Sequence, residues 1–291
     1  TYSGNADEGS ALPSTVTVVG NYAFRNCSSL TTINLEAVKT IGTYAFQGCA
    51  SLTEADISVA TSVGTYAFDG CASLVKVTLN SSLTTLSNYL FRGCSSLEEI
   101  NLEAIKTVGT YCFQNCVALR AAELTSATSI GNYAFNGCSE LTTVKLPAVT
   151  TLGTNSFRDC VKLSNVQLNM SLKTISNSAF RGCKALELIQ LPNELEKIDA
   201  YAFRESGLTL IEFPVSLTDV DFSAFGYCYN LEEITVKDTE SGFYIDEESG
   251  WLMYRDGESL ALLMTLGNLQ GEVIVPASKA GEASGRKMLP N

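Results

Sequence analysis

Apolar positions recur along most of this chain at a fixed period of 22 or 23 residues. One unit reads C-x-x-L-x-x-I-x-L-x-x-V-x-T-I-G-x-Y-A-F-x-G, and the extra residue of the longer units falls in the loop after the first apolar run, as in LNSSLTTLS (79–87). Such a period predicts an elongated array of repeats instead of one globular core. The phenylalanines mark the period most clearly, at Phe24, Phe46, Phe68, Phe91, Phe113, Phe135, Phe157, Phe180, Phe203 and Phe225.

Each unit predicts two short extended segments followed by a tight helical turn. LTTINL (30–35) alternates at its end, with Ile33 and Leu35 inward, which indicates a half-buried strand. A second extended piece follows at KTIG (39–42). GTYAFQGC (42–49) then predicts a single helical turn, because it begins with a residue accepted at an N-cap and ends with one that tolerates the left-handed conformation.

The residues that open and close the predicted helical turn form two further columns. Glu205 and Tyr227 replace the usual Gly, Asn or Asp of the closing column, so we expect the last two turns to be less regular. The opening column contains Gly20, Gly42, Gly64, Ser87, Gly109, Gly131, Gly153, Ser176, Asp199 and Asp221. The closing column contains Asn26, Gly48, Gly70, Gly93, Asn115, Gly137, Asp159 and Gly182.

A single unit has about five inward apolar residues, too few for a core of its own, so stacking must bury them. The pattern predicts an α/β repeat solenoid of the right-handed leucine-rich repeat type, with about ten units of 22–23 residues and parallel strands along one face. The motif C-x-x-L-x-x-I-x-L…I-G-x-x-A-F resembles the BspA-like class of leucine-rich repeats over about residues 12–236. That resemblance implies a secreted or surface-attached protein. Several members of the class adhere to host or extracellular-matrix proteins.

We expect three regions: a disordered or partial tail over 1–11, the solenoid over 12–236, and a β-hairpin cap with a tail over 237–291. The segment 242–264 predicts paired strands with a turn at Arg255-Asp256-Gly257, and 272–276 a further strand. A cap is expected because the last repeat would otherwise expose its apolar columns. The start of the chain lacks the features of a signal peptide, so we expect a fragment of a longer protein.

Charge and composition exclude several classes of function. The formal charge of −12 disfavours binding to nucleic acid or to anionic membrane surfaces, because proteins hold both through Lys and Arg side chains. Direct membrane insertion is not expected, since no apolar run reaches the ~18 residues of a span. The chain contains no histidine, which removes Ser-His-Asp and Cys-His catalysis and histidine metal sites. We therefore expect no enzymatic activity, no cofactor and no metal.

The cysteines form a column of their own, which raises the question of a disulfide or zinc framework. Equivalent residues of stacked strands lie ~4.8 Å apart with parallel side chains, so their Cβ atoms stay beyond the usual disulfide range. No close C-x-x-C pair could converge on zinc. We predict buried, reduced, structural cysteines, with occasional disulfides as the alternative. The column contains Cys27, Cys49, Cys71, Cys94, Cys116, Cys138, Cys160, Cys183 and Cys228, with Ser206 in one position.

A tyrosine column allows two interpretations. It could present a platform for sugars, or form an edge ladder with half-packed rings and solvated hydroxyls, and we favour the ladder. Asn155, Ser178 and Ser223 interrupt the column. Its members are Tyr22, Tyr44, Tyr66, Tyr89, Tyr111, Tyr133 and Tyr201.

The outward residues of the first strand vary from unit to unit, whereas the buried columns are uniform. A solvent-exposed face that binds nothing would show the same variation. However, the curvature of a solenoid makes such a face concave, and the concave face is the usual binding side. Leu188 and Leu210 form an apolar step in this polar strip. The candidate binding residues are Asn34, Asp56, Thr78, Asn101, Glu123, Lys145, Gln167 and Gln190 in one column, and Glu54, Lys76, Glu99, Leu188 and Leu210 in the other.

The sequence thus favours a monomeric, non-enzymatic binding or adhesion module that acts outside the cell and contacts a protein through the concave strand face. Two alternatives remain open. The array could be an architectural spacer of the cell envelope, or it could bind a glycan through the tyrosine column.

Overall fold

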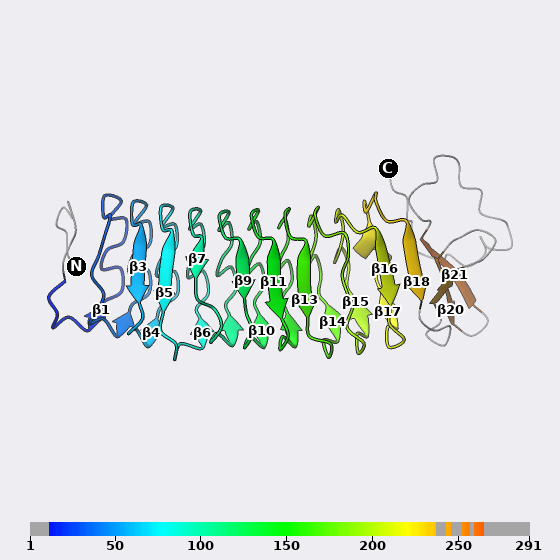
Figure 1. Cartoon of the computed structure of the whole chain (residues 1–291), viewed down its shortest axis with the longest axis horizontal. Helices are drawn as coiled ribbons and strands as arrows, with labels where there is room; N and C mark the ends of the chain where they lie inside the picture. Colours follow the sequence, from blue (N-terminus) through cyan, green and yellow to red (C-terminus); the bar gives the residue numbers. More distant parts are fainter. Residues whose placement is uncertain (1–11, 237–242, 246–251, 257–258, 265–291) are drawn as a thin grey trace.

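The computed structural model describes residues 12–236, 243–245, 252–256 and 259–264. Residues 12–236 form a stack of similar turns that follow one another along the long axis of the molecule (Figure 1). Most turns contribute a strand to a first row and a two-residue strand to a second row. The expectations for residues 1–11, 272–276 and the final tail lie outside the described residues.

The first row of strands is built from the alternating segments. In the burial pattern of β3, Glu54 and Asp56 are exposed while Ala55 and Ile57 are buried, so one face of each strand points into the stack. The strands pair in parallel as three sheets, β3-β5-β7, β9-β11-β13 and β16-β18. They are β3 (Glu54–Ile57), β5 (Lys76–Leu79), β7 (Glu99–Ile100), β9 (Ala121–Glu123), β11 (Thr143–Leu146), β13 (Asn165–Leu168), β16 (Leu210–Phe213) and β18 (Glu233–Val236).

The second row also consists of parallel strands, in three sheets ordered β1-β2-β4, β6-β8-β10-β12 and β14-β15-β17. Each strand places one outward residue before one buried aliphatic residue. They are β1 (Val18–Val19), β2 (Thr40–Ile41), β4 (Ser62–Val63), β6 (Thr85–Leu86), β8 (Thr107–Val108), β10 (Ser129–Ile130), β12 (Thr151–Leu152), β14 (Thr174–Ile175), β15 (Lys197–Ile198) and β17 (Asp219–Val220).

In every turn but the last, the third segment is a series of tight turns and not the predicted helical turn. The amide of Ala45 donates to the carbonyl of Gly42 (3.3 Å), but the amide of Tyr44 donates to Thr65 of the next turn (3.0 Å). Tyr44 and Gly48 have φ of 58° and 72°, which an α-helix does not allow. Alternate amides therefore point at the neighbouring turn, and the stack satisfies them instead of a helix.

The predicted α/β class is wrong for this reason, and the fold is a parallel β-solenoid of about ten turns. Within the described residues, the 3-10 helix η1 (Phe222–Phe225) is the only helix. Asp221 caps it, accepting the Ser223 amide at 3.0 Å. The expectation that the last two turns are less regular holds only for the last one, in which η1 replaces the tight turns. Glu205 and Tyr227 themselves have a positive φ of 61°, like the closing residues of the other turns.

The opening column is glycine in most turns because successive turns approach closely there, and the predicted N-cap role holds at Asp221. A Cβ added to Gly64 would lie 2.5 Å from the backbone nitrogen of Thr43. In a turn with the inserted residue, Ser87 takes this position, and its hydroxyl donates to the carbonyl of Val63 (2.6 Å).

The core is a set of continuous ladders that run along the stack. From Phe24 to Phe225, consecutive phenylalanine rings stack with centroid distances of 5.1–5.7 Å. Buried columns of leucine, isoleucine, valine, alanine and cysteine pack beside this ladder. Every turn therefore depends on its neighbours for burial, as the repeat pattern predicts.

After the last turn, an antiparallel sheet replaces the parallel rows. It has the order β19 (Phe243–Ile245), β20 (Leu252–Asp256) and β21 (Ser259–Met264). Asp256 pairs with Ser259, so Arg255 and Asp256 of the predicted turn lie in β20, and Gly257 lies outside the described residues. β19 lies beside β18, the last strand of the first row. This position fits the cap role, which remains a proposal.

Candidate binding surface

We call the outward side chains of the first row, with the residues in line with them, the first-strand face. All thirteen candidate binding residues are exposed or half-buried on it. The parallel register aligns Glu54, Lys76 and Glu99 on successive turns. In the neighbouring column, Lys145 lies between Glu123 and Gln167. The repeat pattern thus predicts correctly which side chains share a column, while their role in binding remains a proposal.

Two lysines on this face are paired with glutamates of adjacent turns. Lys76 Nζ lies 3.4 Å from a carboxylate oxygen of Glu99, and Lys145 Nζ lies 3.0 Å from one of Glu123. Because all four side chains are solvent-accessible, these pairs add little to stability. They do fix a local pattern of alternating charge that a partner could read.

Several candidate residues also hold the solenoid together, which the sequence reasoning missed. The side-chain oxygens of Asn34 and Asp56 accept the amides of Glu36 (2.9 Å) and Ser58 (3.0 Å). Asn101 bonds both the amide (2.7 Å) and the carbonyl (3.2 Å) of Leu79 on the preceding turn. An Asx residue at the start of a loop is a recognisable signal for the first kind of bond.

The first-strand face is interrupted near its C-terminal end. Leu188 and Gln190 lie between β13 and β16 in a segment that forms no strand. Thr209 nevertheless donates its amide (3.0 Å) and its hydroxyl (3.3 Å) to the carbonyl of Glu187, which keeps the turns in line. Leu188 and Leu210 therefore lie on adjacent turns, with 57% and 41% of their surface exposed.

The tyrosine column forms a ladder with its rings face to face. From Tyr22 to Tyr133, consecutive ring centroids are 4.3–5.1 Å apart and nearly parallel. Aromatic rings usually bind sugars with their faces, and here neighbouring rings cover most of those faces. Arg25 and Arg92 each lie over two rings, with guanidinium carbons 5.2–5.6 Å from the centroids. This geometry supports the structural interpretation of the column.

A hydrogen-bonded polar column beside the tyrosines was not anticipated. Arg25 donates to Gln47 (2.7 Å), Gln47 donates to Asp69 (2.8 Å), and Arg92 binds both oxygens of Asp69 (2.8 and 2.9 Å). Asp69 is buried, and the bidentate guanidinium compensates its charge. The residues lie 22 or 23 positions apart, so the repeat alignment contains the signal.

The cysteine column is buried except for the half-buried Cys27. Each buried thiol of the column donates to a phenylalanine carbonyl on the preceding turn, for example Cys49 to Phe24 at 3.1 Å. Burial raises the pKa of the Cys138 thiol to about 12. Thiolate chemistry at neutral pH is therefore suppressed in this column. The oxidation state remains the prediction made from column geometry.

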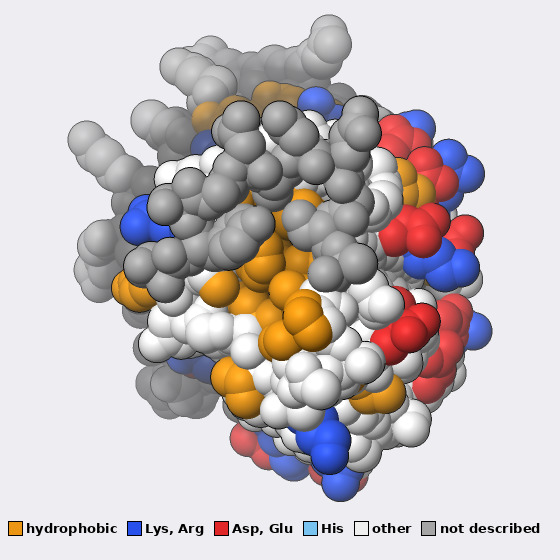
Figure 2. Space-filling model, turned by 90° about the vertical axis from the view of Figure 1, so that its left-hand side faces the viewer, with side chains coloured by type: hydrophobic (Ala, Val, Ile, Leu, Met, Phe, Trp, Pro, Cys, Tyr) orange, Lys and Arg blue, Asp and Glu red, His pale blue; other side chains and the backbone are white. Residues whose placement is uncertain are grey.

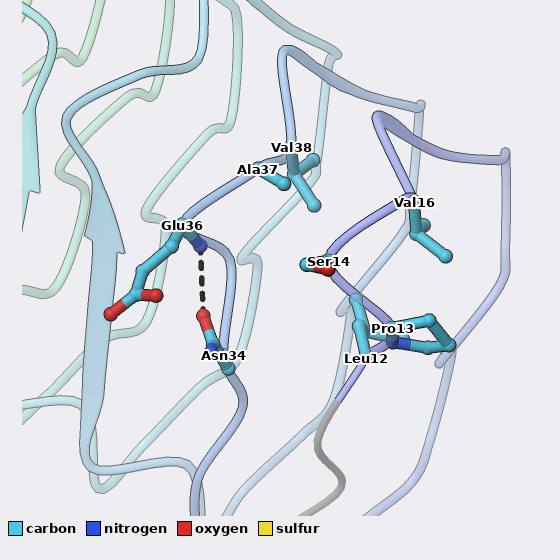
Figure 3. Close-up of a pocket in the computed structure, with 8 residues that line it drawn as sticks. All are labelled: Leu12, Pro13, Ser14, Val16, Asn34, Glu36, Ala37 and Val38. Atoms are coloured by element: carbon cyan, nitrogen blue, oxygen red, sulfur yellow. Dashed lines mark hydrogen bonds between the residues drawn. The ribbon is translucent and has the colours of Figure 1, made fainter.

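A pocket of about 260 Å³ lies at the N-terminal end of the stack (Figure 3). Leu12, Pro13, Val16 and Val38 supply apolar walls, and the side chain of Asn34 is occupied by the Glu36 amide. Figure 2 shows apolar side chains on this end of the molecule. Among the described lining residues, Glu36 is the only one with a titratable side chain. The remaining lining residues of the pocket are Ser14, Glu36 and Ala37.

Two searches of the described residues give negative results. No helix there is both long and apolar enough to cross a bilayer. Over the same residues, no three side chains of His, Cys, Asp or Glu gather in an arrangement that could hold a metal ion.

Internal ladders, parallel strand rows and one variable outer face define a class of protein, the leucine-rich repeat solenoids. The family model described as a BspA type leucine rich repeat region matches residues 8–120 and 106–232. The chain belongs to the BspA-type leucine-rich repeat family, so the resemblance seen in its motif is confirmed. This family is a non-enzymatic one.

Several solved structures are similar to this chain. A leucine rich cell surface protein from Faecalibacterium prausnitzii is 25% identical over 80% of both chains, with a TM-score of 0.44. A leucine-rich repeat protein from Bacteroides ovatus is 29% identical over 78% of both chains, with a TM-score of 0.47. The pneumococcal vaccine antigen PcpA is 20% identical over 80% of this chain and 69% of its own, with a TM-score of 0.47. No curated protein matches the chain.

Proposed function

We propose that the protein is a non-enzymatic binding module, secreted or attached to the cell surface, which contacts a host or matrix protein through the first-strand face. The observation that carries the proposal is the contrast between uniform internal ladders and outward columns whose residue types vary along the stack. Family membership supports both the binding role and the extracellular location. The protein acts as a monomer in this proposal.

The chemistry of the chain supports a binding role in place of catalysis. Its nucleophilic candidates, the column thiols, are mostly buried and hydrogen-bonded. The first-strand face offers exposed charges and amides on adjacent turns, which suit many modest polar contacts across a wide surface. An architectural spacer would use the same stack without a partner, and the binding experiment distinguishes the two roles.

A charge swap tests the proposal without removing an ion pair. Glu123→Lys combined with Lys145→Glu preserves a pair across the 3.0 Å contact but reverses its orientation on the face. The matched control is Glu140→Lys with Lys162→Glu, a pair at 2.7 Å that lies outside the two outward columns. Both double variants leave the net charge unchanged.

Biolayer interferometry against immobilised fibronectin, laminin and collagen, with a glycan array in parallel, provides the measurement. We expect at least one protein to bind, with roughly tenfold weaker affinity for the face swap and unchanged affinity for the control swap. Equal effects of the two swaps, or the absence of any bound protein, would overturn the proposal. Glycan binding that Tyr66→Asn abolishes would favour the tyrosine column instead.

A further inference from the structure

The C-terminal third of the first-strand face differs in charge balance from the rest. On the earlier turns, Lys76 and Lys145 pair with glutamates of adjacent turns. Glu187, Glu232 and Glu233 have no ion-pair partner among the described residues. Within the described residues after Lys145, no lysine or arginine occupies an outward position of the first row, so these exposed carboxylates lie on a part of the face without basic side chains.

These carboxylates lie next to the two exposed leucines in the chain and in the register of the turns. The backbone of Thr209 bonds to Glu187 on one side (3.0 Å) and accepts the amides of Glu232 (2.8 Å) and Glu233 (3.3 Å) on the other. Leu210 is the register partner of Glu233, and Leu188 follows Glu187 in the chain. We call the five residues Glu187, Leu188, Leu210, Glu232 and Glu233 the acidic leucine patch.

We propose that the acidic leucine patch docks a cationic peptide segment of a protein partner, one that carries an aliphatic or aromatic side chain between lysines or arginines. The inference rests on the proposed binding role of the first-strand face and names the chemistry of the partner. The leucines supply an apolar contact that gains affinity when water is excluded. The carboxylates supply the charges that select a basic segment and repel an acidic one.

Other occupants fit the patch less well. A second copy of this chain would bring a protein with a formal charge of −12 against three carboxylates. An anionic lipid surface would be repelled for the same reason. Two leucines alone would be an ordinary exposed pair, and it is the adjacent carboxylates that point to a basic partner.

The test uses three labelled model peptides and fluorescence anisotropy with the full chain. The first alternates lysine with leucine, the second replaces leucine by serine, and the third replaces lysine by glutamate. We expect the lysine–leucine peptide to bind best, with an affinity that falls as salt is added, and the glutamate peptide not to bind. Binding that does not depend on the leucines of the peptide would contradict the proposal.

Two patch variants and one matched control locate the site. The patch variants are Leu188→Ser with Leu210→Ser, and Glu232→Gln with Glu233→Gln. The control is Glu36→Gln with Glu103→Gln, which removes two exposed charges that lie outside the two outward columns. We expect roughly tenfold weaker binding of the lysine–leucine peptide to each patch variant and little change for the control. All substituted residues are exposed, and thermal unfolding of each variant checks that the fold is intact.

Equal weakening by the control would show attraction to bulk charge and overturn the inference. A dimer in sedimentation velocity that the leucine variant dissolves would overturn it as well, because the patch would then bind a second copy. If the peptide result fails while the Glu123/Lys145 swap still weakens capture of a matrix protein, the inference is wrong and the proposed function stands. If the peptide results hold while the Glu123/Lys145 swap has no effect on capture of a matrix protein, the patch remains a peptide site and the proposed function of the first-strand face is wrong.

Discussion

Ser156 is the one residue of its column whose side chain works against the fold. The other turns place alanine, leucine or cysteine there, whereas the buried Ser156 hydroxyl has no hydrogen-bond partner among the residues that the structure describes. An unpartnered buried hydroxyl costs the free energy of its lost hydration. The stack tolerates this free-energy cost because the other inward positions of the same turn carry buried apolar side chains, as they do in the other turns.

Ser156→Ala should therefore stabilise the protein, raising the free energy of unfolding by about 1–2 kcal/mol. Urea denaturation of the two proteins gives the measurement. Ser206→Ala is the matched control, because the Ser206 hydroxyl lies 3.3 Å from Cys228 Sγ and its removal should be destabilising. A destabilising Ser156→Ala would show that the hydroxyl has a partner after all.

The buried thiols predict a specific loss of stability in alkali. Burial raises the pKa of Cys138 from 9.0 to about 12, so the folded thiol keeps a proton that the unfolded thiol has lost. The unfolded state then binds fewer protons between these values, and the free energy of unfolding falls as pH rises above about 9. Below that pH the contribution of the thiol to stability is fully present.

Cys138→Ala removes this dependence at one site. The destabilisation caused by the substitution should be about 1.4 kcal/mol smaller at pH 10 than at pH 7. At pH 10 the unfolded wild-type protein gains free energy by ionising this thiol, which the folded protein cannot do, and the variant has no thiol at this position. Urea unfolding at the two pH values, in reductant, measures the difference. Groups common to both proteins cancel, so an identical pH dependence would contradict the burial of a neutral thiol.

At the scale of the element, the tight turns and the tyrosine ladder depend on each other. Tyrosine rarely has positive φ, yet Tyr22, Tyr44 and Tyr66 have φ of 58–61°. The strain is offset because each amide finds a carbonyl on the next turn and each ring finds a ring. Stacking and backbone conformation therefore stabilise each other.

An interior tyrosine should consequently matter more than a terminal one. Tyr66 stacks on two rings, at 4.6 and 4.3 Å, and Tyr22 on one at 5.1 Å. Each has an arginine 5.6 Å above it, so the number of ring partners is the main difference. Asparagine suits the left-handed conformation, and the chain itself uses Asn155 in this column at φ 56°.

We expect Tyr66→Asn to lower the free energy of unfolding by about 1–3 kcal/mol and Tyr22→Asn by about half as much. Chemical denaturation followed by circular dichroism gives both values. Equal losses would mean that ring stacking contributes little and that backbone strain decides the effect.

The sequence predicts the columns well and the local geometry less well. Strand alternation and period place the inward leucines and phenylalanines correctly, since a side chain's face follows from its position in the repeat. The segment GTYAFQGC is too short to show a helical period, and its conformation is set by hydrogen bonds to a neighbour 22 residues away. The thiol bonds to phenylalanine carbonyls likewise join residues of adjacent turns.

At the scale of the whole molecule, the hydrophobic core runs along the stack, and the stability of each turn depends on its neighbours. Interior turns have a neighbour on each side, while the terminal turns have fewer contacts. Such arrays open from their ends before they unfold as a whole. The half-buried Cys27 lies in the first turn, and Cys116 lies deep within the stack.

Alkylation by iodoacetamide, mapped by mass spectrometry, should therefore modify Cys27 first and Cys116 last. Full modification of all ten cysteines is expected only in denaturant, and without added reductant if the thiols are free. Equal rates at Cys27 and Cys116 would contradict an ordered stack. Fewer than about eight reactive thiols in denaturant would contradict the prediction from column geometry that the cysteines are reduced.

The central claim is that the internal ladders build the fold and the first-strand face binds the partner. Carbodiimide labelling of carboxylates, read by mass spectrometry with and without the bound matrix protein, tests it most directly. The account predicts protection of Glu54, Asp56 and Glu123 on that face, with unchanged labelling of Glu140 and Asp199. Protection of the second group without the first would contradict the claim.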